Sequence, residues 1–107
     1  MGDAGSPYAR FRRALDTGDV TIVRAAALEL PRVGLADALR VCYVMRHDPD
    51  LYERAIVRWV GRFCLEGRAD LDAVQAAVEA LGALPHFPRQ SADRLARLCR
   101  DHGVPMR

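Results

Sequence analysis

The sequence predicts an all-α protein, a compact bundle of about six helices packed as antiparallel hairpins. Apolar residues recur three and four positions apart along most of the 107 residues, which is the spacing of one face of a helix. No segment alternates apolar and polar residues between turn signals, as a strand would. Half of the residues are hydrophobic, so the chain has enough apolar surface to form a core.

Helix-start residues and turn residues divide the chain into segments. A chain of this length suits one domain, which we expect over residues 6–103, between a flexible N-terminus (residues 1–5) and a C-terminal tail (residues 104–107). The connection between the third and fourth segments is so short that it forces an antiparallel hairpin. The expected helices cover about residues 8–16, 20–30, 35–47, 49–66 and 71–84, with a last helix that Ser91 caps and Gly103 ends.

Residues 49–66 form the most apolar of these segments, and we expect the others to pack around it. One stripe along this helix consists of Tyr52, Ile56, Trp59, Val60 and Phe63. A second stripe beside it consists of Val57, Gly61, Cys64 and Leu65. Two stripes predict two neighbours, and Gly61 would let one of them approach closely. Trp59 carries the largest apolar area in the chain, so its burial is the central expectation.

The later segments also carry apolar residues that we expect to be buried. Phe87 is expected to anchor the rigid loop at residues 85–88 to the core. The buried stripe of the fifth helix is expected to consist of Leu71, Val74, Val78 and Leu81.

Composition narrows the cellular setting. All sixteen basic residues are arginine, which with abundant Ala, Gly and Pro is typical of a GC-rich genome. The formal charge of +2 is not that of a dedicated nucleic-acid binder. Three cysteines without CxxC spacing favour reduced thiols in the cytoplasm. No apolar run approaches the ~20 residues of a membrane span, so we expect no membrane partner.

Two sequence comparisons bear on origin and architecture. The stretches RRALDTGDVTIVRAAALELP and YERAIVRWVGRFCLE resemble small uncharacterised all-helical proteins of high-GC actinobacteria, a resemblance that implies a bacterial source and brings no activity with it. Residues 19–26 and 70–77 also echo each other, and each is followed by a proline-containing turn. A short helical-repeat-like array is therefore one architecture, and shared alanine-rich composition is the other explanation of the echo.

Arginine supplies the main candidate for a binding site. Arg54, Arg58 and Arg62 are spaced four apart on the fourth helix, with Asp50 and Glu66 placed to form local ion pairs at either end. The row is either a basic ridge for a partner or a solvated helix face. The second candidate is the outer arc of the third helix, where we expect Asp37 to be exposed beside Arg40, Val44 and His47.

Catalytic and metal-binding patterns are weak. The chain has no nucleophile-elbow, zinc-protease or phosphate-loop motif, so we expect no enzyme and no cofactor. Only Cys99 and His102 have the spacing of a zinc-ligand pair, and we expect no metal site because zinc needs four ligands.

These observations favour a non-catalytic adaptor or regulatory module that binds another protein through an arginine-lined helix face. The partner is unidentified, and a second copy of the chain is one candidate. The alternative is an accessory protein that contacts nucleic-acid phosphates through the same arginines.

Overall fold

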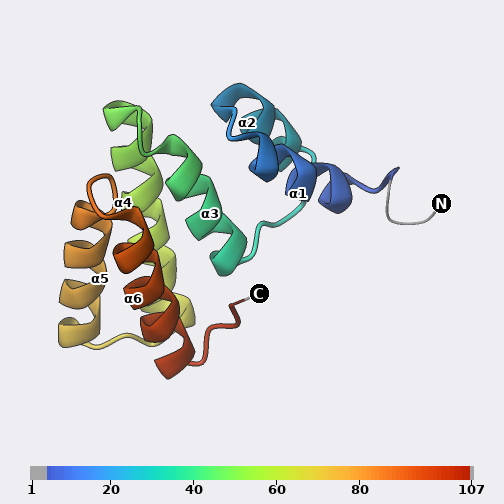
Figure 1. Cartoon of the computed structure of the whole chain (residues 1–107). Coiled ribbons are helices and arrows are strands. Elements are labelled where there is room, and N and C mark those ends of the chain that lie inside the picture. The colour runs from blue at the N-terminus through green and yellow to red at the C-terminus, as the bar shows by residue number, and fades with distance from the viewer. Residues whose placement is uncertain (1–4, 107) are drawn as a thin grey trace. The chain divides into compact units, whose positions relative to one another are not determined.

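The computed structural model describes residues 5–106, and every regular element within them is a helix (Figure 1). The all-α prediction and the six helices are therefore confirmed. The N-terminal residues 1–4 of the expected flexible end lie outside the described residues, as does Arg107. The helices are α1 (Pro7–Thr17), α2 (Val20–Leu28), α3 (Leu35–Met45), α4 (Pro49–Glu66), α5 (Leu71–Ala83) and α6 (Pro88–Asp101). The chain divides after Gly34 into two compact units.

Local capping sets the bounds of the two helices in the first unit. The Ser6 hydroxyl oxygen accepts a hydrogen bond from the Ala9 N–H at 3.0 Å, at the start of α1. Gly18 ends α1 in the left-handed conformation (φ 67°), which glycine adopts without steric cost. The Asp19 carboxylate then accepts from the Ile22 N–H at 3.1 Å and starts α2.

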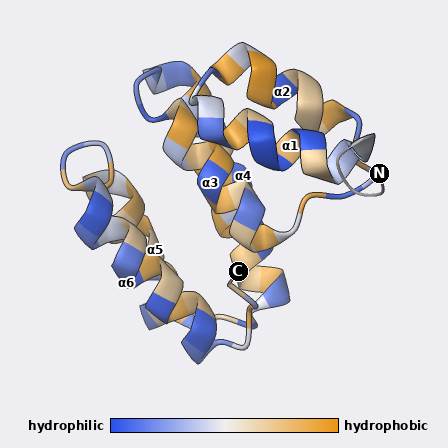
Figure 2. Ribbon diagram, turned by 45° about the vertical axis from the view of Figure 1, so that its right-hand side comes forward, coloured by the Kyte–Doolittle hydropathy of each residue, from blue (hydrophilic) through white to orange (hydrophobic). Residues whose placement is uncertain are grey.

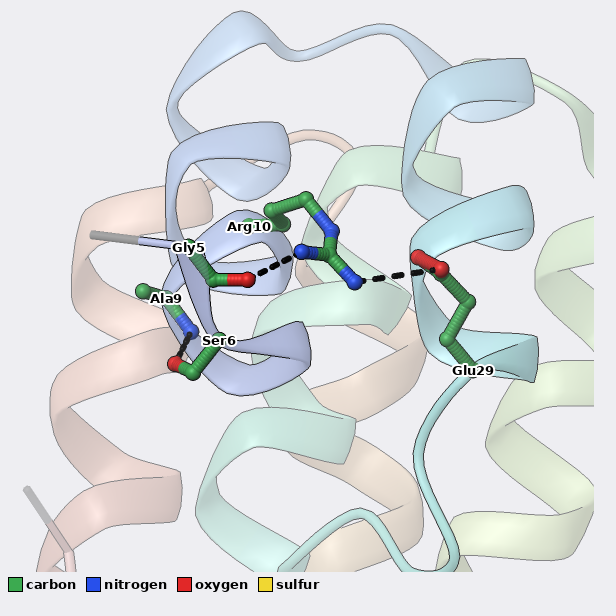
Figure 3. A network of polar contacts seen from close by, with 5 residues as sticks. All are labelled: Gly5, Ser6, Ala9, Arg10 and Glu29. Carbon is green, nitrogen blue, oxygen red and sulfur yellow. Dashed lines mark hydrogen bonds and ion pairs between the residues drawn. The ribbon is translucent and has the colours of Figure 1, made fainter. Parts of the chain in front are cut away.

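Helices α1 and α2 pack together as a hairpin. Phe11 of α1 and Val23 of α2 are both fully buried. Arg10 lies on the outside of this pair, where its guanidinium contacts the Glu29 carboxylate at 3.3 Å and also donates to the Gly5 carbonyl (Figure 3). This ion pair joins α1 to the residue that follows α2.

The second unit contains α3 to α6, and each of these helices has hydrophobic and hydrophilic sides (Figure 2). Trp59 is at its centre with 1% of its surface exposed. Its indole stacks on Phe63 with ring centroids 5.3 Å apart, and its N–H donates to the Leu35 carbonyl at 2.9 Å. The Tyr52 hydroxyl donates to the carbonyl of Leu81 on α5. The prediction of a tryptophan-centred core is thus confirmed, and these two bonds tie α4 to α3 and to α5.

Helix α5 buries a different side from the one that the sequence predicted. Leu71 and Val78 are exposed, so the predicted stripe is wrong for these two residues. The reason is one of size, because small side chains let α5 pack closely against its neighbours, whose bulky rings fill the core. Its buried residues are Ala73, Ala77, Ala80 and Leu81, followed by Leu84 just beyond the helix.

The second apolar stripe of α4 is also exposed, except for Cys64, which is half-buried. Val57 and Leu65 face solvent, and a Cβ added at Gly61 would meet no atom within 4 Å. The expectation that a neighbouring helix covers this stripe is therefore wrong for the part of the chain that the structure describes. Helices α3 and α5 both pack on the Trp59 side of α4.

The C-terminal part differs from expectation in three more places. Phe87 is 60% exposed and does not anchor its loop. Pro88 is the first residue of α6, a position that proline favours, whereas Ser91 is buried inside the helix and is not its cap. Val104, expected in a tail, is buried in the core, and its N–H bonds to the Cys99 carbonyl at 2.8 Å.

Candidate functional site

The arginine row of α4 is shorter in the structure than in the sequence. Arg54 and Arg58 are exposed, and neither forms an ion pair within residues 5–106. The local pair with Asp50 at the start of the helix is therefore absent. Arg62 is half-buried, and its Nε donates to the Glu66 carboxylate at 2.7 Å, as its spacing predicted. Two guanidiniums of the predicted three are thus available for a partner.

The second predicted surface, on α3, is less open. Arg40 and Val44 are half-buried, and the exposed His47 lies in the turn after the helix ends at Met45. Asp37, which the sequence placed on the exposed arc, is buried. The structure therefore does not unite these residues into one exposed helix face.

Aliphatic side chains beside the arginines are the feature that sequence reasoning missed. Val57 is 67% exposed and Leu65 82% exposed, on the same outward side of α4 as Arg54 and Arg58. An open hollow surrounds Val57, lined by Asp50, Glu53, Arg54 and Arg58. The four-residue spacing of Val57, Gly61 and Leu65 is the sequence signal for this surface, but the same spacing is also typical of a core stripe.

A matching apolar row lies on α5, the helix that follows α4. Leu71 is 81% exposed and Val78 is 52% exposed. Because α4 and α5 pack against each other, the two rows can form a single surface. We call this surface the α4–α5 outer face, and it consists of Val57, Gly61, Leu65, Leu71 and Val78 with the flanking Arg54, Arg58, Gln75 and Glu79.

Helix α6 carries a second basic surface that the sequence analysis did not identify. Its exposed arginines form no ion pair among the residues described. Two of them, Arg94 and Arg97, border a groove over Ala76 and Ala80 of α5, and Asp101 lies in the same groove. The exposed arginines of α6 are Arg89, Arg94, Arg97 and Arg100.

Burial in the core raises the pKa values of three side chains. Desolvation raises the pKa of the Cys42 thiol to about 12 and that of Cys99 to about 11. Burial likewise raises the pKa of the Tyr52 hydroxyl. Neutral buried thiols of this kind are poor nucleophiles, because the thiolate is the reactive form. These shifts therefore describe packing and do not indicate a reactive site.

Metal-ligand geometry is absent from the described part of the chain, where no group of three His, Cys, Asp or Glu side chains converges. In the candidate pair, Cys99 is fully buried, and the His102 ring meets the Phe63 ring edge-on with centroids 5.6 Å apart. Among the same residues, no helix combines the length and apolarity needed to cross a membrane.

The raised thiol pKa values predict a loss of stability at alkaline pH. Below pH 9.0, the ordinary thiol pKa, Cys42 is neutral in the folded and unfolded chains. Above it, only the unfolded chain readily releases the proton, so the free energy of unfolding should fall as the pH rises towards about 12. Urea unfolding at a series of pH values measures this. Cys42→Ala should flatten the slope, and an equal slope in both proteins would contradict the assignment.

Fold and surface together define the class: a small all-α protein with an aliphatic, arginine-flanked outer face on α4 and α5. Searches against protein-family models, curated proteins and solved structures find no significant match to the chain.

Proposed function

We propose that this protein is a non-catalytic adaptor or regulatory module that binds another protein through the outward side of α4. The observation that carries the proposal is the exposure of Val57 and Leu65 beside Arg54 and Arg58. Contiguous exposed apolar surface rimmed by polar residues marks interaction sites on proteins. Arginine is also enriched in the contact regions of protein interfaces.

A protein partner fits this surface better than nucleic acid does. Asp50 and Glu53 line the same hollow as the two arginines, and carboxylates repel a phosphate backbone. Burial of an exposed valine or leucine is favourable when it packs against another apolar surface. Nucleic-acid binding through Arg54 and Arg58 is the alternative, because both guanidiniums are exposed and form no ion pair within the described residues.

We further propose a cytoplasmic location, which the three free cysteines support. We also propose Arg40, Val44 and His47 as secondary contacts, with the exposed His47 as the most accessible of the three. Their contribution can be measured with Arg40→Glu in the experiment that follows.

Capture from a lysate of the source cells, with and without nuclease, tests the proposal. The parent protein should retain a protein partner after nuclease treatment, and Arg54→Glu with Arg58→Glu should lose most of it. Arg94→Glu with Arg97→Glu changes the same charge on α6 and is the matched control, which should retain the partner.

Two results would count against the proposal. Capture that depends on intact nucleic acid, with binding to duplex DNA that weakens steeply as salt rises, would favour the phosphate-binding alternative. Equal capture by the parent protein and the α4 variant would exclude the α4 surface as the contact.

A further inference from the structure

We propose that the α4–α5 outer face binds a second copy of this chain, in a two-fold dimer that sets Arg58 of each copy against Glu79 of the other. This inference rests on the proposed function, for which it names the partner. All of the residues involved lie in the second unit, which begins at Leu35.

The two apolar rows lie at matching levels along the hairpin. Leu65 is near the end of α4 and Leu71 at the start of α5, so both are at the end where the helices connect. Val57 and Val78 each lie about two turns further from that end, at 3.6 residues per turn. On a helical projection, Val57 and Leu71 fall on the sides of the two helices that turn away from the Trp59 core.

The two edges of this face carry opposite charge. Arg54 and Arg58 follow the α4 edge, whereas the α5 edge carries the carboxylate of Glu79 beside the uncharged amide of Gln75. Glu79 is exposed and, like Arg58, forms no ion pair within residues 5–106. Each residue is next in sequence to the valine of its own row, so the two charges lie at about the same level on opposite edges.

A two-fold axis parallel to the helices matches the levels of the apolar rows and also pairs the oppositely charged edges. It lays α4 of one copy on α5 of the other and preserves the level of every residue along the helices. The basic edge of each copy then meets the acidic edge of its partner, and the four apolar side chains meet their counterparts in the middle. An acidic partner of another kind would match Arg54 and Arg58 but would leave Glu79 facing like charge.

The size of the face sets the strength of the contact. Helices of 18 and 13 residues are about 27 and 20 Å long, and two side by side are about 20 Å wide. Each copy would contribute roughly 500 Å², which places the dimer at the small end of specific interfaces. The dimer should therefore be reversible and depend on protein concentration.

Charge exchange between Arg58 and Glu79 tests this pairing by sedimentation equilibrium over a concentration series. Arg58→Glu and Glu79→Arg should each weaken the dimer by about tenfold or more, because each creates two like-charge contacts. The double variant R58E/E79R should restore the dimer. An equimolar mixture of the two single variants should also dimerise, because every contact in the mixed pair is again between opposite charges.

The controls separate this inference from the function on which it rests. Arg97→Glu on α6 should leave the dimer unchanged, and circular dichroism should show every variant folded. A chain that stays monomeric at all concentrations, or an Arg58→Glu defect that Glu79→Arg does not repair, would overturn the self-pairing. In either case, the proposed function would stand if the chain still captured another protein through Arg54 and Arg58. If that capture were also absent, both the dimer and the proposed function would be excluded.

Discussion

Replacing Trp59 with alanine should lower the free energy of unfolding by about 3–5 kcal/mol. The indole is 1% exposed, stacks on Phe63 and donates its N–H to the Leu35 carbonyl, so the substitution removes packing on α4 and a bond to α3. Since small domains are stable by only about 5–15 kcal/mol, much of the total would be lost. Urea unfolding followed by circular dichroism measures the loss without relying on tryptophan fluorescence.

Trp59→Phe removes the hydrogen bond while keeping part of the packing. Phenylalanine keeps an aromatic ring beside Phe63 but cannot donate to the Leu35 carbonyl, so an intermediate loss is expected. A loss below about 1 kcal/mol for Trp59→Ala, which is the range of many surface substitutions, would mean that the indole is not at the centre of the core.

Replacing each of two leucines in α5 with alanine should lower the free energy of unfolding by very different amounts. Leu81→Ala should cost about 2–5 kcal/mol because Leu81 is fully buried in the core around Trp59. Leu71→Ala should change stability by about 0.5 kcal/mol or less at protein concentrations where the chain is monomeric, because Leu71 is 81% exposed there. Thermal and urea unfolding of the pair measures the difference within one helix.

Helix propensity changes little in either variant, because leucine and alanine both favour helices. The comparison therefore reports burial alone. Equal losses for the two variants would contradict the orientation of α5 and would return Leu71 to the core.

The helices could be predicted because their ends depend on local contacts. Asp48 accepts a hydrogen bond from the Leu51 N–H at 3.2 Å, and Asp70 accepts one from Ala73 at 2.9 Å, each three residues along the chain. The predicted bounds of 49–66 therefore agree with α4 as observed. Burial of Trp59 could be predicted because no other side chain offers as much apolar area.

The orientation of a helix about its own axis depends on its neighbours, and there the sequence was misleading. Hydrophobic spacing ranks Leu71 and Val78 above Ala77, yet Ala77 is fully buried and the larger pair is exposed. The volume left by Trp59 and Phe63 decides which side chains of α5 fit beneath them. That volume depends on how several helices pack together, so the sequence of one helix cannot predict it.

The candidate site was predictable to a similar degree. The four-residue spacing of Arg62 and Glu66 correctly indicated their ion pair. It could not distinguish Arg62, which is half-buried, from Arg54 and Arg58, which are exposed. The role of Val57 was missed because an apolar residue beside a core stripe is more often buried than exposed.

Amide chemical shifts recorded from dilute to concentrated protein test most directly whether the α4–α5 outer face is a contact surface. We expect the shift changes to concentrate at Val57, Gly61, Leu65, Leu71 and Val78 and at their charged neighbours. Changes centred on the arginines of α6, or spectra that do not depend on concentration, would contradict the assignment of this face as the surface on which two copies meet.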